Sequence, residues 1–404
     1  MISEPESIPT PDIDELPDYP IRRAFQQFYP DHAEMYEVSA EQDKAASMIS
    51  LCKTGRLGYS VSSCPECGYT KIRARSCNNR CCPSCQVPLE QKWVMERNAE
   101  LISGIAYYHV IFTLPHELNN LMTDNQKLLY GLIFSSASGS LITLCRDKKY
   151  MGATPGIVSV LHTWGQKLNY HPHLHVCLSG GGLTDSGQFI ETKHKGFIIP
   201  VRVLGKVFRG KYLAGLKDLY LSGRLVLAGE SAPLCDPAEF GRFLDLLYSK
   251  DWLPFVKETF NGNGNAIKYL GRYAYRTAIS NSRIEEVSDD TVTIRYTDYA
   301  DHNRKKPYVF SGTEFVRGFL QHVLPAGFHR VRLSGFLSNC SKTKNLTHIG
   351  MLRQKPYTGS PTKGKKTAEL LMMIYGSDIT CCPICRHKMI MGCPARAPDN
   401  GLTE

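Results

Sequence analysis

Apolar residues recur along this chain with two different periods, and the period predicts which segments are helices and which are strands. Apolar positions three and four apart predict helices over residues 21–36, 40–52, 88–101, 116–149, 200–227, 236–260, 265–280 and 313–324. Shorter runs rich in β-branched and aromatic residues predict strands over residues 107–114, 156–164, 169–179, 180–191, 284–297, 308–310 and 329–333. The succession of strand, helices, strand, strand indicates an α+β fold, a central antiparallel sheet with flanking helices on one face.

One predicted strand carries three histidines at alternating positions, within the stretch NYHPHLHVCLSGGG at residues 169–182. Side chains alternate between the two faces of a strand, so His171, His173 and His175 are expected to share a face. Two imidazoles on one face can chelate a divalent ion, and His162 on the preceding strand is a candidate third ligand. A set of strand histidines satisfied by hydrogen bonds and a zinc hydrolase site are alternatives that the histidines alone leave open.

Cysteines are grouped rather than scattered: of fifteen, six lie between residues 64 and 85 and four between residues 381 and 393. Two Cys-x2-Cys pairs separated by fourteen residues have zinc-ribbon spacing and predict one closed, structural zinc site, formed by Cys64, Cys67, Cys82 and Cys85. Cys77 and Cys81 are extra, which leaves ligand exchange or a second ion open. The terminal pair Cys382 and Cys385 suggests a second zinc knuckle whose ligand set, with His387 and Cys393, is incomplete by spacing.

Charge is distributed unevenly along the 404 residues, whose formal net charge is +10. Residues 1–20 contain six acidic side chains and no basic one, and they are expected to form a disordered arm. Residues 302–366 contain thirteen Lys or Arg and one acid, which predicts a surface that binds a polyanion. Lys71, Arg73, Arg75 and Arg80 beside the cysteine pairs are likewise expected to contact a DNA backbone.

Targeting signals are absent by sequence: no basic and apolar leader precedes the acidic start, and no apolar run approaches the ~20 residues that a membrane helix needs. Cys-x2-Cys pairs in such a chain favour metal binding over disulfides. We therefore expect a cytoplasmic protein that does not contact a membrane.

A predicted helix near residue 270 carries paired tyrosines. Asn265 can cap it, and Tyr269 and Tyr273 lie four residues apart on one face. An aromatic pair at this spacing is usually core, but these tyrosines have cationic neighbours, Lys268, Arg272 and Arg276.

Taken together, these motifs resemble the two-tyrosine rolling-circle transposases of insertion sequences, in the HUH-nuclease superfamily. The resemblance covers residues 51–339 and rests on SCNNRCCPSCQ, HTWGQKLNYHPHLHVCLSGGG, KYLGRYAYRTAISNSRI and GFHRVRLSGFLSN, in this order. One departure is Cys81, where related sequences tend to have histidine.

The resemblance implies a site and a reaction. His173 and His175 would hold Mg²⁺ or Mn²⁺, while Tyr269 or Tyr273 attacks single-stranded or melted DNA and forms a 5′-phosphotyrosine. Lys268, Arg272 and Arg276 would bind the DNA, and structural Zn²⁺ would hold the cysteine ribbon. No nucleotide cofactor is expected, because the covalent link conserves the phosphodiester energy and no Walker-type loop is present. A homo-oligomer is left open.

Four regions are expected: residues 1–20, an acidic arm; 21–105, a helical and zinc-ribbon DNA-binding domain; 106–337, the nuclease domain; and 338–404, a basic tail. Two rival functions are kept. One is a rolling-circle replication initiator or relaxase, which uses the same chemistry. The other is a non-catalytic zinc-dependent DNA-binding protein, which needs neither the metal histidines nor the tyrosines.

Overall fold

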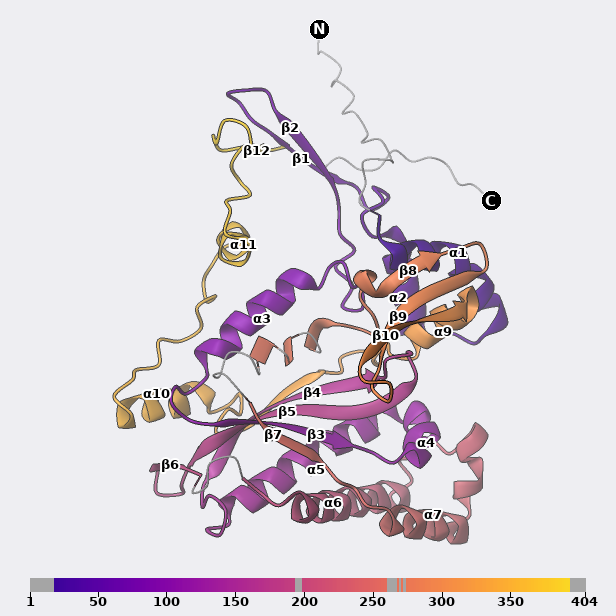
Figure 1. Ribbon diagram of the computed structural model, residues 1–404, viewed down its shortest axis with the longest axis vertical. Coiled ribbons are helices and arrows are strands. Elements are labelled where there is room, and N and C mark those ends of the chain that lie inside the picture. The colour runs from indigo at the N-terminus through magenta and orange to yellow at the C-terminus, as the bar shows by residue number, and fades with distance from the viewer. Residues whose placement is uncertain (1–17, 193–197, 260–266, 269, 272–273, 393–404) are drawn as a thin grey trace.

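An antiparallel sheet lies at the centre of the computed structural model, which describes residues 18–192, 198–259, 267–268, 270–271 and 274–392 (Figure 1). The strands follow the order β11-β4-β5-β3-β7, and β6 pairs with the end of β5. Their bounds are β3 Tyr107–Thr113, β4 Thr154–Trp164, β5 Tyr170–Leu183, β6 Phe189–Glu191, β7 Phe255–Glu258 and β11 Val331–Gly335. The sheet is antiparallel, as the α+β prediction expects, and the histidine strand β5 lies between β4 and β3.

One face of this sheet packs against a layer of helices. Alternate residues of β5, Leu174, Val176 and Leu178, are fully buried in this core, as the period of two predicts. The layer contains the long pair α5 and α6, with α4 and α7 beside them (Figure 1). The elements on this side are η2 His116–Leu118, α4 Asn119–Asp124, α5 Gln126–Arg146, α6 Val201–Leu221, η3 Gly229–Cys235 and α7 Pro237–Ser249.

Helices also cover the opposite face, so the expectation of helices on one face only is wrong. Val158, Val160 and Cys177 point to this side and pack with α3 Val87–Ala99 and α10 Lys342–Leu352. Ile267, Leu270 and Ala274 complete this core from the segment that precedes residue 276. On β4, His162 lies an even number of residues from Val158, and on β5, His173 and His175 lie an even number of residues from Cys177. The three imidazoles therefore face this side too.

A second core joins the start of the chain to its later part. The helices α1 Pro20–Met35 and α2 Ala40–Leu51 pack on α9 Gly312–Leu320 and on a three-stranded sheet. That sheet has the order β10-β9-β8, with β8 Ile284–Val287, η4 Asn281–Arg283 before it, β9 Thr291–Asp298 and β10 Arg304–Ser311. Phe25 meets Phe319 edge-on at 5.1 Å, near the centre of the contact. The division of the chain at residue 105 stays a prediction.

A third, small sheet stands away from the main body (Figure 1). The hairpin β1 Tyr59–Ser63 and β2 Thr70–Ala74 pairs through β1 with β12 Ile390–Met391 at the end of the described chain. The path from α10 to β12 runs through α11 Thr367–Tyr375, which lies against α3. Segments more than three hundred residues apart in sequence thus meet at the hairpin.

The helix α5 passes a length and composition test for a membrane span, contrary to the expectation that no apolar run comes near it. More than half of its apolar stretch is nevertheless buried inside the fold. Ile133, Ala137 and Leu141 are fully buried against the sheet. Its apolar character is therefore accounted for by its place in the core.

Candidate metal and nucleic-acid site

Three imidazoles meet on the face of the central sheet that α3 and α10 cover. His173 and His175 come from β5, and His162 comes from β4, directly opposite His173 in the strand register. The Nε2 atom of His173 lies 3.1 Å from Nε2 of His175 and 2.9 Å from Nδ1 of His162. One ligand atom from each ring lies within 4.8 Å of the others, so a single ion can contact all three. The sequence-based candidate His162 is thus brought to the pair.

The outer nitrogens of the two β5 rings are held by other groups. Nδ1 of His173 donates to the carbonyl oxygen of His171 at 2.6 Å. Nδ1 of His175 lies 3.0 Å from Nε2 of His109, whose ring stacks on that of His175 with 5.2 Å between centroids. A proton on Nδ1 leaves the Nε2 lone pair facing the cluster, which is the arrangement that metal-binding histidines use. Sequence reasoning did not find His109, although its parity on β3 places it on the same face.

Burial keeps these rings neutral. It lowers the pKa of His173 to about 4 and the pKa values of His162 and His175 well below the ordinary 6.5, with repulsion between the rings adding to the effect. The pKa of His109 falls to about 4 for the same reason. Neutral imidazoles with free lone pairs are the form that coordinates a metal.

A cavity of about 660 Å³ opens beside the imidazoles. Its cationic side chains come from beyond the sheet: Arg276, Arg283 and Arg295 with Lys305. Trp164, Tyr296 and Tyr299 add aromatic rings, and among the described residues that line the cavity there is no Asp or Glu. The cavity therefore suits a phosphate-bearing ligand with stacking bases, and a hydrolytic zinc site would lack a carboxylate base there.

The predicted nucleophiles Tyr269 and Tyr273, and with them Arg272, lie outside the described residues. Residues 267–268, 270–271 and 274–275 are helical, as predicted, but the predicted extension to residue 280 is wrong because no described residue from 276 to 280 is helical. The predicted cap Asn265 lies outside the described residues. Lys268 is exposed. Tyr275 packs edge-on against Trp93.

The end of this segment is fixed to the site. Arg276 lines the cavity. Its carbonyl oxygen accepts a hydrogen bond from the half-buried Arg330 at 2.5 Å, and Arg330 also donates to the Thr277 hydroxyl at 3.0 Å. The same guanidinium lies over the ring of Trp164, two residues after His162. Arg330 thereby ties the segment that follows the tyrosines to the histidine strands.

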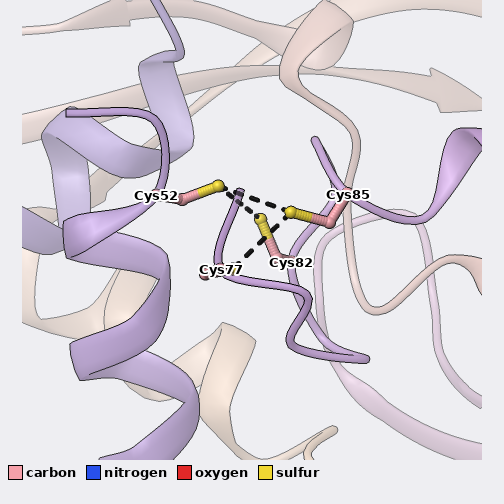
Figure 2. A group of neighbouring side chains, drawn as sticks. All are labelled: Cys52, Cys77, Cys82 and Cys85. Atoms are coloured by element: carbon pink, nitrogen blue, oxygen red, sulfur yellow. Dashed lines mark hydrogen bonds between the residues drawn. The ribbon is translucent and has the colours of Figure 1, made fainter. Parts of the chain in front are cut away.

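The structure does not bring the four predicted ribbon cysteines together. Cys82 and Cys85 meet Cys52 and Cys77, with Sγ–Sγ distances of 3.4–3.6 Å (Figure 2). The reason is the hairpin register: Ser63 pairs with Thr70 at the tip and Tyr59 with Ala74 at the base. Five paired residues at about 3.3 Å each hold the first Cys-x2-Cys turn roughly 15 Å from the second.

The cluster Cys52, Cys77, Cys82 and Cys85 can hold one tetrahedral ion. Three of its thiols are buried in the core shared by α1, α2 and α9. Hydrogen bonds from the neighbouring thiols, Cys52 foremost, hold the pKa of Cys85 well below its usual range. Sequence reasoning missed Cys52, because it stands alone at the end of a helix. Cys81 belongs to neither cysteine cluster among the described residues.

Arg80, predicted to contact DNA, has another role. Its guanidinium donates to the carbonyl oxygens of Leu324, Pro325 and Phe328 and so docks the cysteine turn on the loop after α9. Three carbonyl partners converge on one cation, which leaves fewer donors for a phosphate. Lys71, Arg73 and Arg75 remain predicted DNA contacts.

Comparison with known proteins adds family information. The family model described as "Transposase zinc-binding domain" matches residues 24–114, and the one described as "Putative transposase" matches residues 156–344. The chain is similar to "Putative transposase y4qJ" of Sinorhizobium fredii, with 38% identity over 89% of this chain and 90% of the relative. It is also similar to "Transposase for insertion sequence element IS801" of Pseudomonas savastanoi pv. phaseolicola, with 28% identity over 90% and 85%. No solved structure matches.

Proposed function

This chain belongs to the family of insertion-sequence transposases with an N-terminal zinc-binding domain, and from that premise we propose that it nicks and rejoins single-stranded DNA through a covalent tyrosine intermediate. The observation that carries the proposal is the imidazole cluster at the wall of a cationic cavity. DNA binding alone does not require three buried, neutral histidines whose ring nitrogens converge, whereas a bound ion would use the nitrogens that face one another in this cluster.

The donor set fits a divalent metal ion. His162, His173 and His175 would hold it through neutral nitrogens, and the side of the cluster that faces the cavity leaves room for substrate oxygens. Bound there, the ion supplies Lewis-acid polarisation of the scissile phosphate. Imidazole donors favour Mn²⁺ over Mg²⁺, which prefers oxygen ligands, so we propose that Mn²⁺ supports the reaction at lower concentration.

The nucleophile in this proposal is the hydroxyl of Tyr269 or Tyr273. Its oxygen attacks the phosphorus, a Tyr–O–P bond forms, and the P–O3′ bond breaks. The phenol loses its proton, and the departing 3′-oxygen leaves as a hydroxyl after taking one. One phosphodiester is exchanged for another, so the 3′-OH can reverse the step on a second strand without ATP. Two tyrosines suit the two cleavages that excision of an element requires.

Cations around the cavity would hold the strand during this step. Arg276 lines the cavity on the side that follows the tyrosine segment, and Lys305 lines it from β10. Arg283 and Arg295 also line it, but some of their donors are engaged, those of Arg283 by two carbonyl oxygens and Nε of Arg295 by the Glu285 carboxylate. Tyr296 and Tyr299 offer faces on which unpaired bases can stack, whereas Trp164 is buried beneath Arg330. A duplex presents its bases already stacked, so this lining favours a single or melted strand. The reaction would take place in the cytoplasm, and the protomer number stays open.

Zinc completes the proposal as a structural ion. The family's zinc-binding domain covers all four residues of the cluster Cys52, Cys77, Cys82 and Cys85. Four thiolates leave no open coordination position, so this ion would take no part in the chemistry. It would instead fix α2 and the start of α3 to the core beside the cavity.

A nicking assay on end-labelled single-stranded DNA from an element's ends tests the proposal. Nicking should require Mn²⁺ or Mg²⁺ and should disappear in Tyr269→Phe/Tyr273→Phe and in His173→Ala/His175→Ala, while DNA binding stays within a few-fold. Tyr275→Phe is the matched control on the same segment and should nick normally. Tight binding without nicking by the unaltered protein, on DNA that a related transposase cleaves, would support the binding-protein alternative instead.

A further inference from the structure

A second group of four thiols lies at the tip of the β1–β2 hairpin. Cys64 and Cys67 come from the hairpin turn, and Cys382 and Cys385 come from the C-terminal segment. The two C-terminal cysteines lie outside both family matches, which end at residues 114 and 344. We propose that these four cysteines bind one zinc ion, which fastens the C-terminal segment to the hairpin.

The two halves of the site have the same backbone turn. In the sequence Cys64-Pro-Glu-Cys67-Gly68, the amide of Gly68 donates to the carbonyl of Cys64 at 3.1 Å, and the amide of Cys64 donates to that of Tyr69 at 2.8 Å. The C-terminal half repeats this pattern. The amide of Arg386 donates to the carbonyl of Cys382 at 3.0 Å, and the amide of Cys382 donates to the carbonyl of His387 at 2.7 Å.

Both turns also end in the left-handed region. Gly68 has φ = 72° and Arg386 has φ = 66°. A side chain other than glycine rarely adopts such a φ, so the strain at Arg386 needs compensation from its surroundings. A Cys-x2-Cys turn of this kind presents two thiolates to one ion, and two such turns facing each other give the tetrahedral set of a zinc ribbon.

The distances fit a shared ion better than disulfides. Sγ of Cys64 lies 3.3 Å from Sγ of Cys385, and Sγ of Cys67 lies 3.5 Å from Sγ of Cys382. A disulfide needs about 2.05 Å, whereas sulfurs at about 2.3 Å from one zinc ion are about 3.8 Å apart. A set of four thiolates suits zinc or iron among the biological metals.

In the described part of the C-terminal segment, residues 367–392 bury little apolar surface of their own. The helix α11 has no buried residue, and around the cysteines Ile384, Ile390 and Met391 are 60–70% exposed. The strand β12 contributes only two paired positions to β1, Ser62 with Met391 and Ser63 with Ile390. Such a contact buries too little apolar surface to order a segment on its own, and small modules of this kind depend on a metal.

Thiol protection tests the site without altering the protein. Cys67 is exposed and Cys385 is half-buried, so without a metal both should react readily with iodoacetamide. In the purified protein, Cys64, Cys67, Cys382 and Cys385 should instead be protected together, whereas the exposed Cys235 and Cys340 react. A zinc chelator should expose all four at once. Prompt alkylation of Cys67 in zinc-loaded protein would overturn the proposal.

Metal counting supplies the second test. In a His173→Ala/His175→Ala background, which removes the imidazole site, the protein should contain two zinc ions, and Cys382→Ser/Cys385→Ser should remove one. Cys381→Ser, next to the site but outside it, is the matched control and should keep both. Unchanged zinc in the double variant, iron in place of zinc, or a Cys64–Cys385 disulfide in a non-reducing peptide map would each contradict the site.

Exchange of backbone hydrogens separates a local effect from misfolding. In Cys382→Ser/Cys385→Ser, exchange should rise in α11 and β12 and in the hairpin β1–β2, while β4 and β5 stay protected. These measurements do not depend on DNA cleavage, so the zinc site and the proposed function can fail separately.

Discussion

Replacing His109 by alanine should weaken metal binding at the imidazole cluster, although His109 is not one of the three converging rings. Its Nε2 lies 3.0 Å from Nδ1 of His175, and the two rings are stacked at an interplanar angle of 8°. When Nε2 of His175 binds an ion, Nδ1 of the neutral ring must carry the proton and donate to Nε2 of His109, which holds the ring in that orientation. Without it, the His175 ring can rotate or change tautomer.

The size of the effect follows from the two contacts that are lost. A half-buried hydrogen bond contributes about 0.5–1.5 kcal/mol, and a stacked ring pair contributes about 0.5–1.5 kcal/mol more. Their sum, about 1–3 kcal/mol, corresponds to a loss of roughly 5- to 150-fold in metal affinity. Loss of outer-shell partners of metal ligands typically costs about 10- to 100-fold, so a weakening near 30-fold is expected.

Calorimetric titration of DNA-free protein with Mn²⁺ measures this directly. His109→Gln keeps an acceptor for the Nδ1 proton and should recover part of the affinity. His171→Ala is the matched control: it removes a cavity imidazole but keeps the backbone carbonyl that holds His173, so its affinity should change less than about threefold. An unchanged affinity in His109→Ala, or an equal loss in His171→Ala, would refute the reasoning.

Three further predictions concern stability. Cys52→Ser should remove one zinc ion and lower the urea midpoint, because Cys52 is a buried member of the cluster in Figure 2; the exposed Cys235→Ser should do neither, and an unchanged zinc count in Cys52→Ser would contradict that ligand set. Arg80→Ala should lower the free energy of unfolding by about 1–3 kcal/mol through loss of its bonds to three carbonyls, whereas Arg73→Ala on the exposed edge of β2 should change it by less than about 0.5 kcal/mol; equal effects would argue against docking by Arg80. Burial lowers the pKa of His322 to about 3, below its unfolded value of about 6.5, so its neutral form stabilises the fold above pH 6.5 and that contribution is lost as the pH falls toward 3. His322→Gln should therefore reduce the stability lost between pH 7 and pH 5 by about 2 kcal/mol, and an identical pH dependence in both proteins would show that His322 does not contribute.

Strand periodicity predicted the imidazole site because the relevant physics is local. Alternation along β5 puts His173 and His175 on one face, and the antiparallel neighbour β4 places His162 opposite them. The partner on β3, His109, was missed because strand pairing across the sheet is set by the whole topology. The tyrosines Tyr269 and Tyr273 remain predictions.

Cysteine spacing predicted pairs of ligands but not which pairs share an ion. Each Cys-x2-Cys turn is a local structure, whereas its partner depends on where a hairpin points. Register in β1 and β2 carries Cys64 and Cys67 away from Cys82 and Cys85. Cys52, at the end of α2, and Cys77 instead complete the ligand set of Cys82 and Cys85. Tertiary packing brings them there, and the spacing of cysteines in the sequence does not predict it.

The arginines illustrate the same limit. Arg80 was predicted to contact DNA because it lies in a basic stretch, yet it binds carbonyls near residue 325. Carbonyl oxygens that converge in a loop and phosphate oxygens both attract a guanidinium, and sequence proximity to other cations does not distinguish them.

Mass spectrometry of the protein after reaction with single-stranded DNA tests the central claim most directly. Trypsin cleaves after Lys268, Arg272 and Arg276, so Tyr269 and Tyr273 fall in different peptides, and fragmentation separates Tyr273 from Tyr275. The account predicts a nucleotide attached through a 5′-phosphate to Tyr269 or Tyr273, formed with Mn²⁺ and absent in His173→Ala/His175→Ala. Nicked DNA with no protein attached, or an adduct on a residue outside this segment, would contradict it.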